Sequence, residues 1–134
     1  MKVTKSAAIM LLALVHAFVF GVVYASIGAR FGFYNLASAG SFMRSALPSA
    51  SIASLVVTAP LAFAAGRIGG RPFLLYSSLA FILAWVTLAI LDYRLVFLLS
   101  EYFLIPPAVA LIAIACSGYV FFTLGSRARH SVRA

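Results

Sequence analysis

The sequence predicts an all-α integral membrane protein, a four-transmembrane-helix bundle with both termini on the cytoplasmic side. Three observations lead to this fold class: the composition, four long apolar stretches, and the distribution of basic residues. Hydrophobic residues make up 65% of the 134 residues and charged residues only 9%, whereas about a quarter of a soluble domain is charged. A chain of this length has room for one membrane domain of about four spans.

The first span is expected over residues 6–26. Its core, from Ser6 to Ala25, has no formally charged side chain and is about as long as a helix that crosses the hydrocarbon of a bilayer. A secretory signal peptide also begins with a short basic leader, and residues 23–25, Val-Tyr-Ala, would be a tolerable cleavage site. The apolar run is longer than a usual signal core and contains a histidine, so we expect an uncleaved span.

The remaining spans are expected over residues 49–66, 73–91 and 104–124. Pro48 suits the first turn of the second span, and Pro60 should kink that span because it leaves the Val56 carbonyl without its N–H partner. A tight turn is expected at residues 67–71. Pro106 and Pro107 should open the fourth span, and the basic tail after it should be frayed.

Two connections are expected outside the hydrocarbon. Residues 27–48 are too polar and too rich in glycine to cross it, and their aromatic and arginine side chains suit a loop or short helix at the interface. A binding surface is the alternative interpretation of this outer loop. Residues 92–103 contain both acids of the chain, Asp92 and Glu101, which are costly to bury in lipid. This second connection should lie among the headgroups.

The basic residues predict the orientation. The leader, the 67–71 turn and the tail hold seven of the ten Lys and Arg residues, and the two opposite connections hold three. Because short loops with more Lys and Arg stay in the cytoplasm, both termini are predicted to be cytoplasmic, in a bacterial inner membrane. The formal charge of +8 is therefore explained by orientation and anionic headgroups rather than by nucleic acid.

Small residues recur every fourth position along the first two spans. Such stripes let helix backbones approach each other in lipid, and they predict a close crossing of these two spans. The predicted packing residues of the first span are Ala13, Ala17, Gly21 and Ala25. Those of the second span are Ala50, Ser54, Thr58, Ala62 and Gly66.

A candidate polar layer lies near mid-membrane. At about 1.5 Å per residue, His16 and Thr58 lie at similar depths in antiparallel spans, and Cys116 and Ser117 lie near that depth in the fourth. We interpret His16 as a neutral imidazole that is hydrogen-bonded to Thr58 or Ser117 and fixes the helix register. The functional alternative is a histidine that senses protons or a ligand, or an axial ligand to a haem supplied with a partner.

No catalytic motif, phosphate-binding loop or cluster of metal ligands is visible, and both acids lie outside the spans. We therefore predict that the protein is not an enzyme and carries no cofactor or metal. The expected function is interaction through its helices with another membrane protein, as an accessory subunit, assembly factor or immunity-type protein. The alternative is a transporter or channel for a small solute or ion, formed by self-association, with His16 and the mid-membrane hydroxyls along its path.

Overall fold

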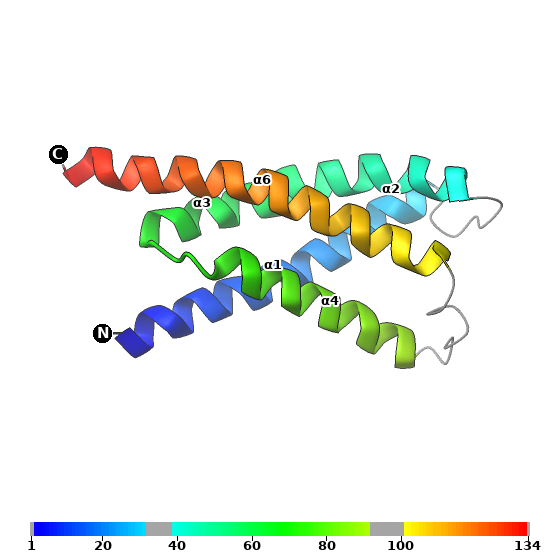
Figure 1. The fold of residues 1–134 in the computed structure, drawn as a ribbon, viewed down its shortest axis with the longest axis horizontal. Coiled ribbons are helices and arrows are strands. Elements are labelled where there is room, and N and C mark those ends of the chain that lie inside the picture. The colour runs from blue at the N-terminus through cyan, green and yellow to red at the C-terminus, as the bar shows by residue number, and fades with distance from the viewer. Residues whose placement is uncertain (1, 32–38, 92–100, 134) are drawn as a thin grey trace.

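The computed structural model describes residues 2–31, 39–91 and 101–133, which form four helical rods (Figure 1). The first rod is α1 (Lys2–Arg30). The second is continuous and consists of α2 (Ala39–Ala53), a π-helical turn η1 (Ser54–Thr58) and α3 (Ala59–Ile68). The third and fourth rods are α4 (Phe73–Leu91) and α6 (Glu101–Arg133). The prediction of an all-helical protein is confirmed.

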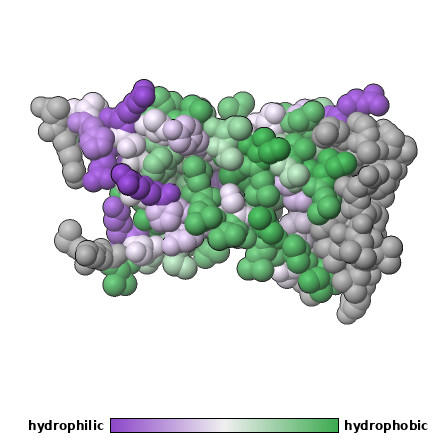
Figure 2. All heavy atoms as spheres, in the orientation of Figure 1, coloured by the Kyte–Doolittle hydropathy of each residue, from purple (hydrophilic) through white to green (hydrophobic). Residues whose placement is uncertain are grey.

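Three of the rods are long and apolar enough to cross a membrane: Val3–Arg30, Arg44–Ile68 and Leu104–Val132. The apolar part of α4, Phe73–Thr87, is shorter. Large apolar side chains point outward, such as Leu11, Phe18 and Leu83, which are 64, 74 and 69% exposed. The surface between the two ends is accordingly dominated by apolar residues (Figure 2). This distribution is typical of a protein whose solvent is lipid.

Both chain ends and the α3–α4 turn lie at the same end of the molecule (Figure 1). Hydrophilic residues gather at that end (Figure 2). We call it the basic end, because it holds the leader, the turn and the end of α6. Within the bundle, α1 packs about equally against α4 and the second rod, and the second rod packs mainly against α6.

The predicted tight turn at residues 67–71 is confirmed, and two glycines close it. Gly69 follows the last residue of α3 with a φ of 70°, a left-handed conformation that favours glycine. Its N–H donates to the Gly66 carbonyl, and the Gly70 N–H donates to the Ala65 carbonyl at 2.8 Å. These two bonds form a Schellman motif, which satisfies carbonyls left open at the helix end.

The second rod begins earlier than the predicted second span. Helix α2 starts at Ala39, so Pro48 lies inside a helix and not in its first turn. Pro60 lies in the first turn of α3, directly after the π-helical turn. In that turn the Ala59 N–H donates to the Ser54 carbonyl, five residues back. The disturbance expected at Pro60 is therefore absorbed by a wider helical turn just before the proline.

The fourth rod is longer than predicted at both ends. Helix α6 begins at Glu101, so Pro106 and Pro107 lie inside it rather than at its start. It runs to Arg133, and the tail that was expected to be frayed is helical. Gly125 does not end the helix, because it packs against the backbone of Phe63. Residues 32–38 of the expected interfacial loop and residues 92–100 of the expected headgroup segment lie outside the described residues.

The small-residue stripe of the second rod is buried throughout, but its closest partner is not α1. A Cβ added at Gly66 would collide with the Phe122 carbonyl and lie 2.9 Å from the Ser126 nitrogen, both on α6. A Cβ at Gly125 would collide with the backbone of Phe63 on α3. The close backbone contact is therefore between α3 and α6.

Only the first two of the four small residues in the stripe of the first span are buried. Ala13 and Ala17 are buried, whereas Gly21 and Ala25 are only partly covered. A Cβ at Gly21 would meet no neighbour within 4 Å. The close crossing predicted for the first two spans does not include Gly21, because a four-residue spacing advances about 40° around a helix of 3.6 residues per turn at each step. The stripe therefore winds out of the interface.

Gly66 and Gly21 provide a matched test of this packing. We expect Gly66→Ala to destabilise the protein by about 1–3 kcal/mol, because the added methyl group has no room against the α6 backbone. Gly21→Ala should leave the protein as stable as the wild type or up to about 1 kcal/mol more stable, because its methyl group meets no neighbour and alanine favours a helix. Denaturant unfolding of both variants in detergent would measure the difference, and equal losses would contradict the α3–α6 contact.

Candidate functional site

The most distinctive polar feature of the interior is a hydrogen bond between α1 and η1. His16 Nε2 lies 2.9 Å from Thr58 Oγ1, and neither residue has any exposed surface. The bond joins the two residues whose depths in antiparallel spans predicted it. Buried polar groups in lipid require such partners, because no water is available to satisfy them.

Aromatic and small residues enclose this pair. The Phe20 ring stacks on the imidazole at 5.5 Å between ring centroids, and the Phe73 ring meets it edge-on at 5.7 Å. On the side of α6, a Cβ at Gly118 would lie 3.4 Å from the Thr58 methyl group. The absence of a side chain at Gly118 therefore lets α6 lie close to the site.

The π-helical turn determines where Thr58 points. Three consecutive residues, Val57, Thr58 and Ala59, are buried at its end. A wider turn places more successive side chains on one face than a regular α-turn does, and π-turns occur often at functional sites. Neither the proline nor the apolar pattern of this segment specified that a π-turn would form here.

The other two members of the predicted polar layer do not join it. Cys116 is exposed on the outer surface of α6. The Ser117 hydroxyl is partly buried and donates to the Ala113 carbonyl of its own helix at 2.7 Å. A serine or threonine in a membrane helix can always satisfy its hydroxyl in this way, so depth alone did not identify which hydroxyl meets the histidine.

The second nitrogen of the imidazole, His16 Nδ1, is buried without a hydrogen-bond partner. In a neutral imidazole one nitrogen donates and the other accepts. If Nε2 accepts from Thr58, Nδ1 is a donor, and if Nε2 donates to Thr58, Nδ1 is an acceptor. An unsatisfied buried polar atom is uncommon and costs stability. The site therefore retains one unused donor or acceptor in the middle of the bundle.

An aromatic column, formed by His16, Phe20, Tyr24, Phe73, Phe81 and Trp85, extends from this pair along α1 and α4. Phe20 meets Phe81 at 5.4 Å between centroids, and Tyr24 meets Phe81 at 6.5 Å. The Tyr24 hydroxyl donates to the Pro106 carbonyl of α6 at 2.8 Å. Sequence reasoning missed this column. Its signal was the i, i+4, i+8 spacing of His16, Phe20 and Tyr24, which places them on one helix face.

The chemistry available to this arrangement is limited. Among the described residues no group of three or more His, Cys, Asp or Glu side chains could hold a metal ion. His16 is hydrogen-bonded to a hydroxyl, not to a carboxylate, and the neighbouring side chains are aromatic. Such a pair can hold two helices in register. Alternatively, Nδ1 can form a hydrogen bond with a bound solute or transfer a proton to or from it.

Fold and site together define a class, a helical membrane protein whose buried polar groups link its helices. Comparisons with protein-family models, curated proteins and solved structures found no match for the chain. Its function must therefore be argued from its own residues.

The histidine and threonine can be tested as a structural pair. We expect His16→Leu and Thr58→Val each to lower the free energy of unfolding by about 0.6–2 kcal/mol, the range for hydrogen bonds in membranes. His16→Gln should lose less, because an amide can still bond to Thr58. Thr87→Val is the control, since that exposed hydroxyl bonds only to Leu83 of its own helix. A His16→Gln variant that folds normally but has lost function would contradict a purely structural role.

Proposed function

We propose that the protein acts without catalysis in a membrane, by binding another membrane protein through its helices as an accessory subunit, assembly factor or immunity-type protein. The single observation that carries this proposal is the open surface at Gly21. A glycine inside a long helix has no packing role toward its own chain there, because a Cβ would meet nothing within 4 Å. Small residues at such positions let a second helix approach closely in lipid.

The surroundings of Gly21 support this proposal. Its neighbours Phe18 and Val22 are 74 and 52% exposed, and Ala25 is partly covered one turn further along. A shallow small-residue site flanked by large apolar side chains offers both close backbone contact and van der Waals area to a partner helix. The partner would be a membrane span, because this part of α1 is apolar on every side.

We further propose that α4 is a fourth span and that the basic end faces the cytoplasm of a bacterial inner membrane. Helix α4 has 19 residues, which corresponds to about 28 Å and to nearly the full hydrocarbon thickness. The chain termini and the α3–α4 turn share the end with seven of the ten Lys and Arg residues. The positive-inside rule places such an end in the cytoplasm.

A transporter or channel formed by self-association is the second candidate. The unpartnered Nδ1 of His16 favours it, because an unused donor or acceptor in mid-span is a natural point for a proton or solute to bind. The enclosure of His16 by Phe20 and Phe73 favours the first candidate, since these rings separate the imidazole from the surface.

The orientation can be measured by cysteine labelling in a Cys116→Ser background. Phe31 and Ile68 are both exposed and lie at opposite ends of the bundle. In sealed cells Phe31→Cys should react with an impermeant maleimide, and Ile68→Cys should react only after the membrane is opened. The reverse pattern would place the basic end outside.

The partner can be tested by purification from native membranes in mild detergent. A membrane protein should co-purify in stoichiometric amount, and Gly21→Leu should reduce its recovery at least tenfold because the leucine fills the contact. Leu83→Phe is the control, as it enlarges a side chain that is 69% exposed on α4 and lies away from Gly21 in the sequence. A homo-oligomer that permeabilises liposomes, and that becomes inactive in the His16→Gln variant, would instead support the second candidate.

A further inference from the structure

Two cationic side chains from distant parts of the sequence meet at the α3–α4 turn. A Cβ at Gly69 would collide with the guanidinium of Arg129 from α6 and lie 3.4 Å from the ammonium of Lys5 from α1. The missing side chain of Gly69 therefore lets both charges lie against the turn. Lys5 is exposed and Arg129 is partly buried.

In the part of the chain that the structure describes, the protein has no acidic residue near these charges. Its two acids are Asp92 and Glu101. Glu101 begins α6, and Arg129 lies near the other end of that helix, roughly 40 Å away. Asp92 lies outside the described residues. Two like charges that converge with no carboxylate among their described neighbours favour an anion supplied from outside the chain.

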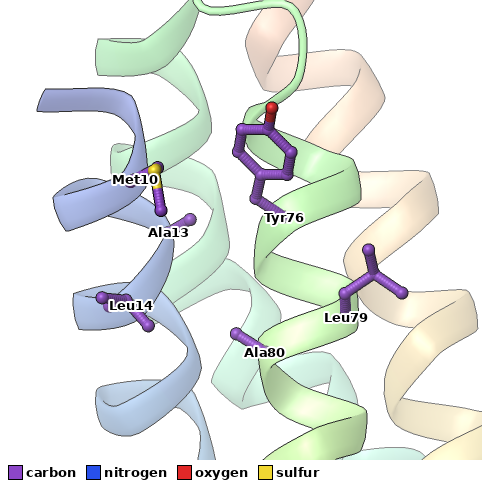
Figure 3. A pocket seen from close by; sticks show the side chains of 6 residues that line it. All are labelled: Met10, Ala13, Leu14, Tyr76, Leu79 and Ala80. Atoms are coloured by element: carbon purple, nitrogen blue, oxygen red, sulfur yellow. The ribbon is translucent and has the colours of Figure 1, made fainter. Parts of the chain in front are cut away.

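An apolar groove of about 320 Å³ lies between α1 and α4 just below this turn (Figure 3). It is lined by Met10, Ala13, Leu14, Tyr76, Leu79 and Ala80. The turn and the groove adjoin, because Tyr76, which lines the groove, lies in the first turn of α4, directly after the α3–α4 turn. The Tyr76 hydroxyl points toward the turn and the apolar lining continues away from it (Figure 3).

We propose that this end of the protein binds one anionic phospholipid of the surrounding membrane. The phosphate lies between Lys5 and Arg129 at the Gly69 turn, and a segment of one acyl chain occupies the groove between α1 and α4. Charge and shape together select this occupant. A free phosphate contacts only the cations, and an apolar partner helix contacts only the groove. An anionic lipid contacts both, because its headgroup lies at the cations and its acyl chain extends from there into the adjoining groove.

The cationic half is tested by native mass spectrometry of the full-length protein. The probe is an equimolar mixture of dioleoylphosphatidylglycerol and dioleoylphosphatidylcholine in detergent micelles. The wild type should retain one phosphatidylglycerol with at least a fivefold preference. Lys5→Gln combined with Arg129→Gln should abolish that preference. Arg67→Gln combined with Arg127→Gln removes the same charge from exposed residues at the same end and should leave most of it.

The groove is tested by filling it from its exposed rim. Met10→Trp should reduce the retained phosphatidylglycerol at least fivefold, because the indole occupies the path of the acyl chain. Leu11→Trp is the control, since that residue is equally exposed on α1 but does not line the groove. Circular dichroism and size-exclusion chromatography confirm that each variant is folded.

Three results would overturn the proposal. The first is equal retention of the two lipids by the wild type. The second is displacement of phosphatidylglycerol by millimolar inorganic phosphate together with an unaffected Met10→Trp variant, which would indicate a site for free phosphate. The third is a Met10→Trp variant that binds lipid normally but loses a co-purifying membrane protein, which would assign the groove to a partner helix. None of these experiments changes Gly21. The lipid-site proposal can therefore be contradicted while the proposed function is supported, and the proposed function can be contradicted while the lipid site is supported.

Discussion

Close backbone contact between α3 and α6 is the constraint on which the rest of the bundle depends. Lipid chains are as apolar as leucine, so helices in a membrane gain little from burying large apolar side chains against each other. They gain from the van der Waals contact of closely approaching, complementary helix surfaces. Here Gly66 and Gly125 each face the backbone of the opposite helix. Because a methyl group has no room at either position, the two rods share a surface onto which α1 and α4 pack.

The buried hydrogen bonds then fix the positions of the helices on this surface. His16 joins α1 to the π-helical turn of the second rod, and Tyr24 joins α1 to α6 at Pro106. Between them the aromatic column fills the space next to α4. Since α1 contributes half of this column and takes part in two interhelical hydrogen bonds, it is an integral part of the core rather than a peripheral anchor. Gly21 and the groove residues Met10 and Leu14 lie along another face of the same helix, since 3.6 residues per turn brings all three to nearly the same angle.

Prediction from sequence succeeded where one variable decided the outcome. Depth along antiparallel spans was enough to name Thr58 as one of two candidate partners of His16, and two adjacent glycines were enough to locate the turn after α3. Prediction of the contact partner failed where several helix surfaces had the same composition of small or hydroxyl residues. The stripe with Ala13 and Gly21 was compatible with any neighbouring helix, and Ser117 was as deep as Thr58 but bonded within its own helix.

The sequence by itself determined the solvent, the helical class and the polarity of the two ends, because hydropathy and charge act residue by residue and need no partner. Tertiary structure alone decided which helices touch, since close packing depends on the shape of two surfaces at once. It also decided the π-helical turn before Pro60, the burial of Gly66 against α6 and the meeting of Lys5 with Arg129 at Gly69. Gly66 and its α6 neighbours are far apart along the chain, as are Lys5 and Arg129, and only the packed helices bring them together.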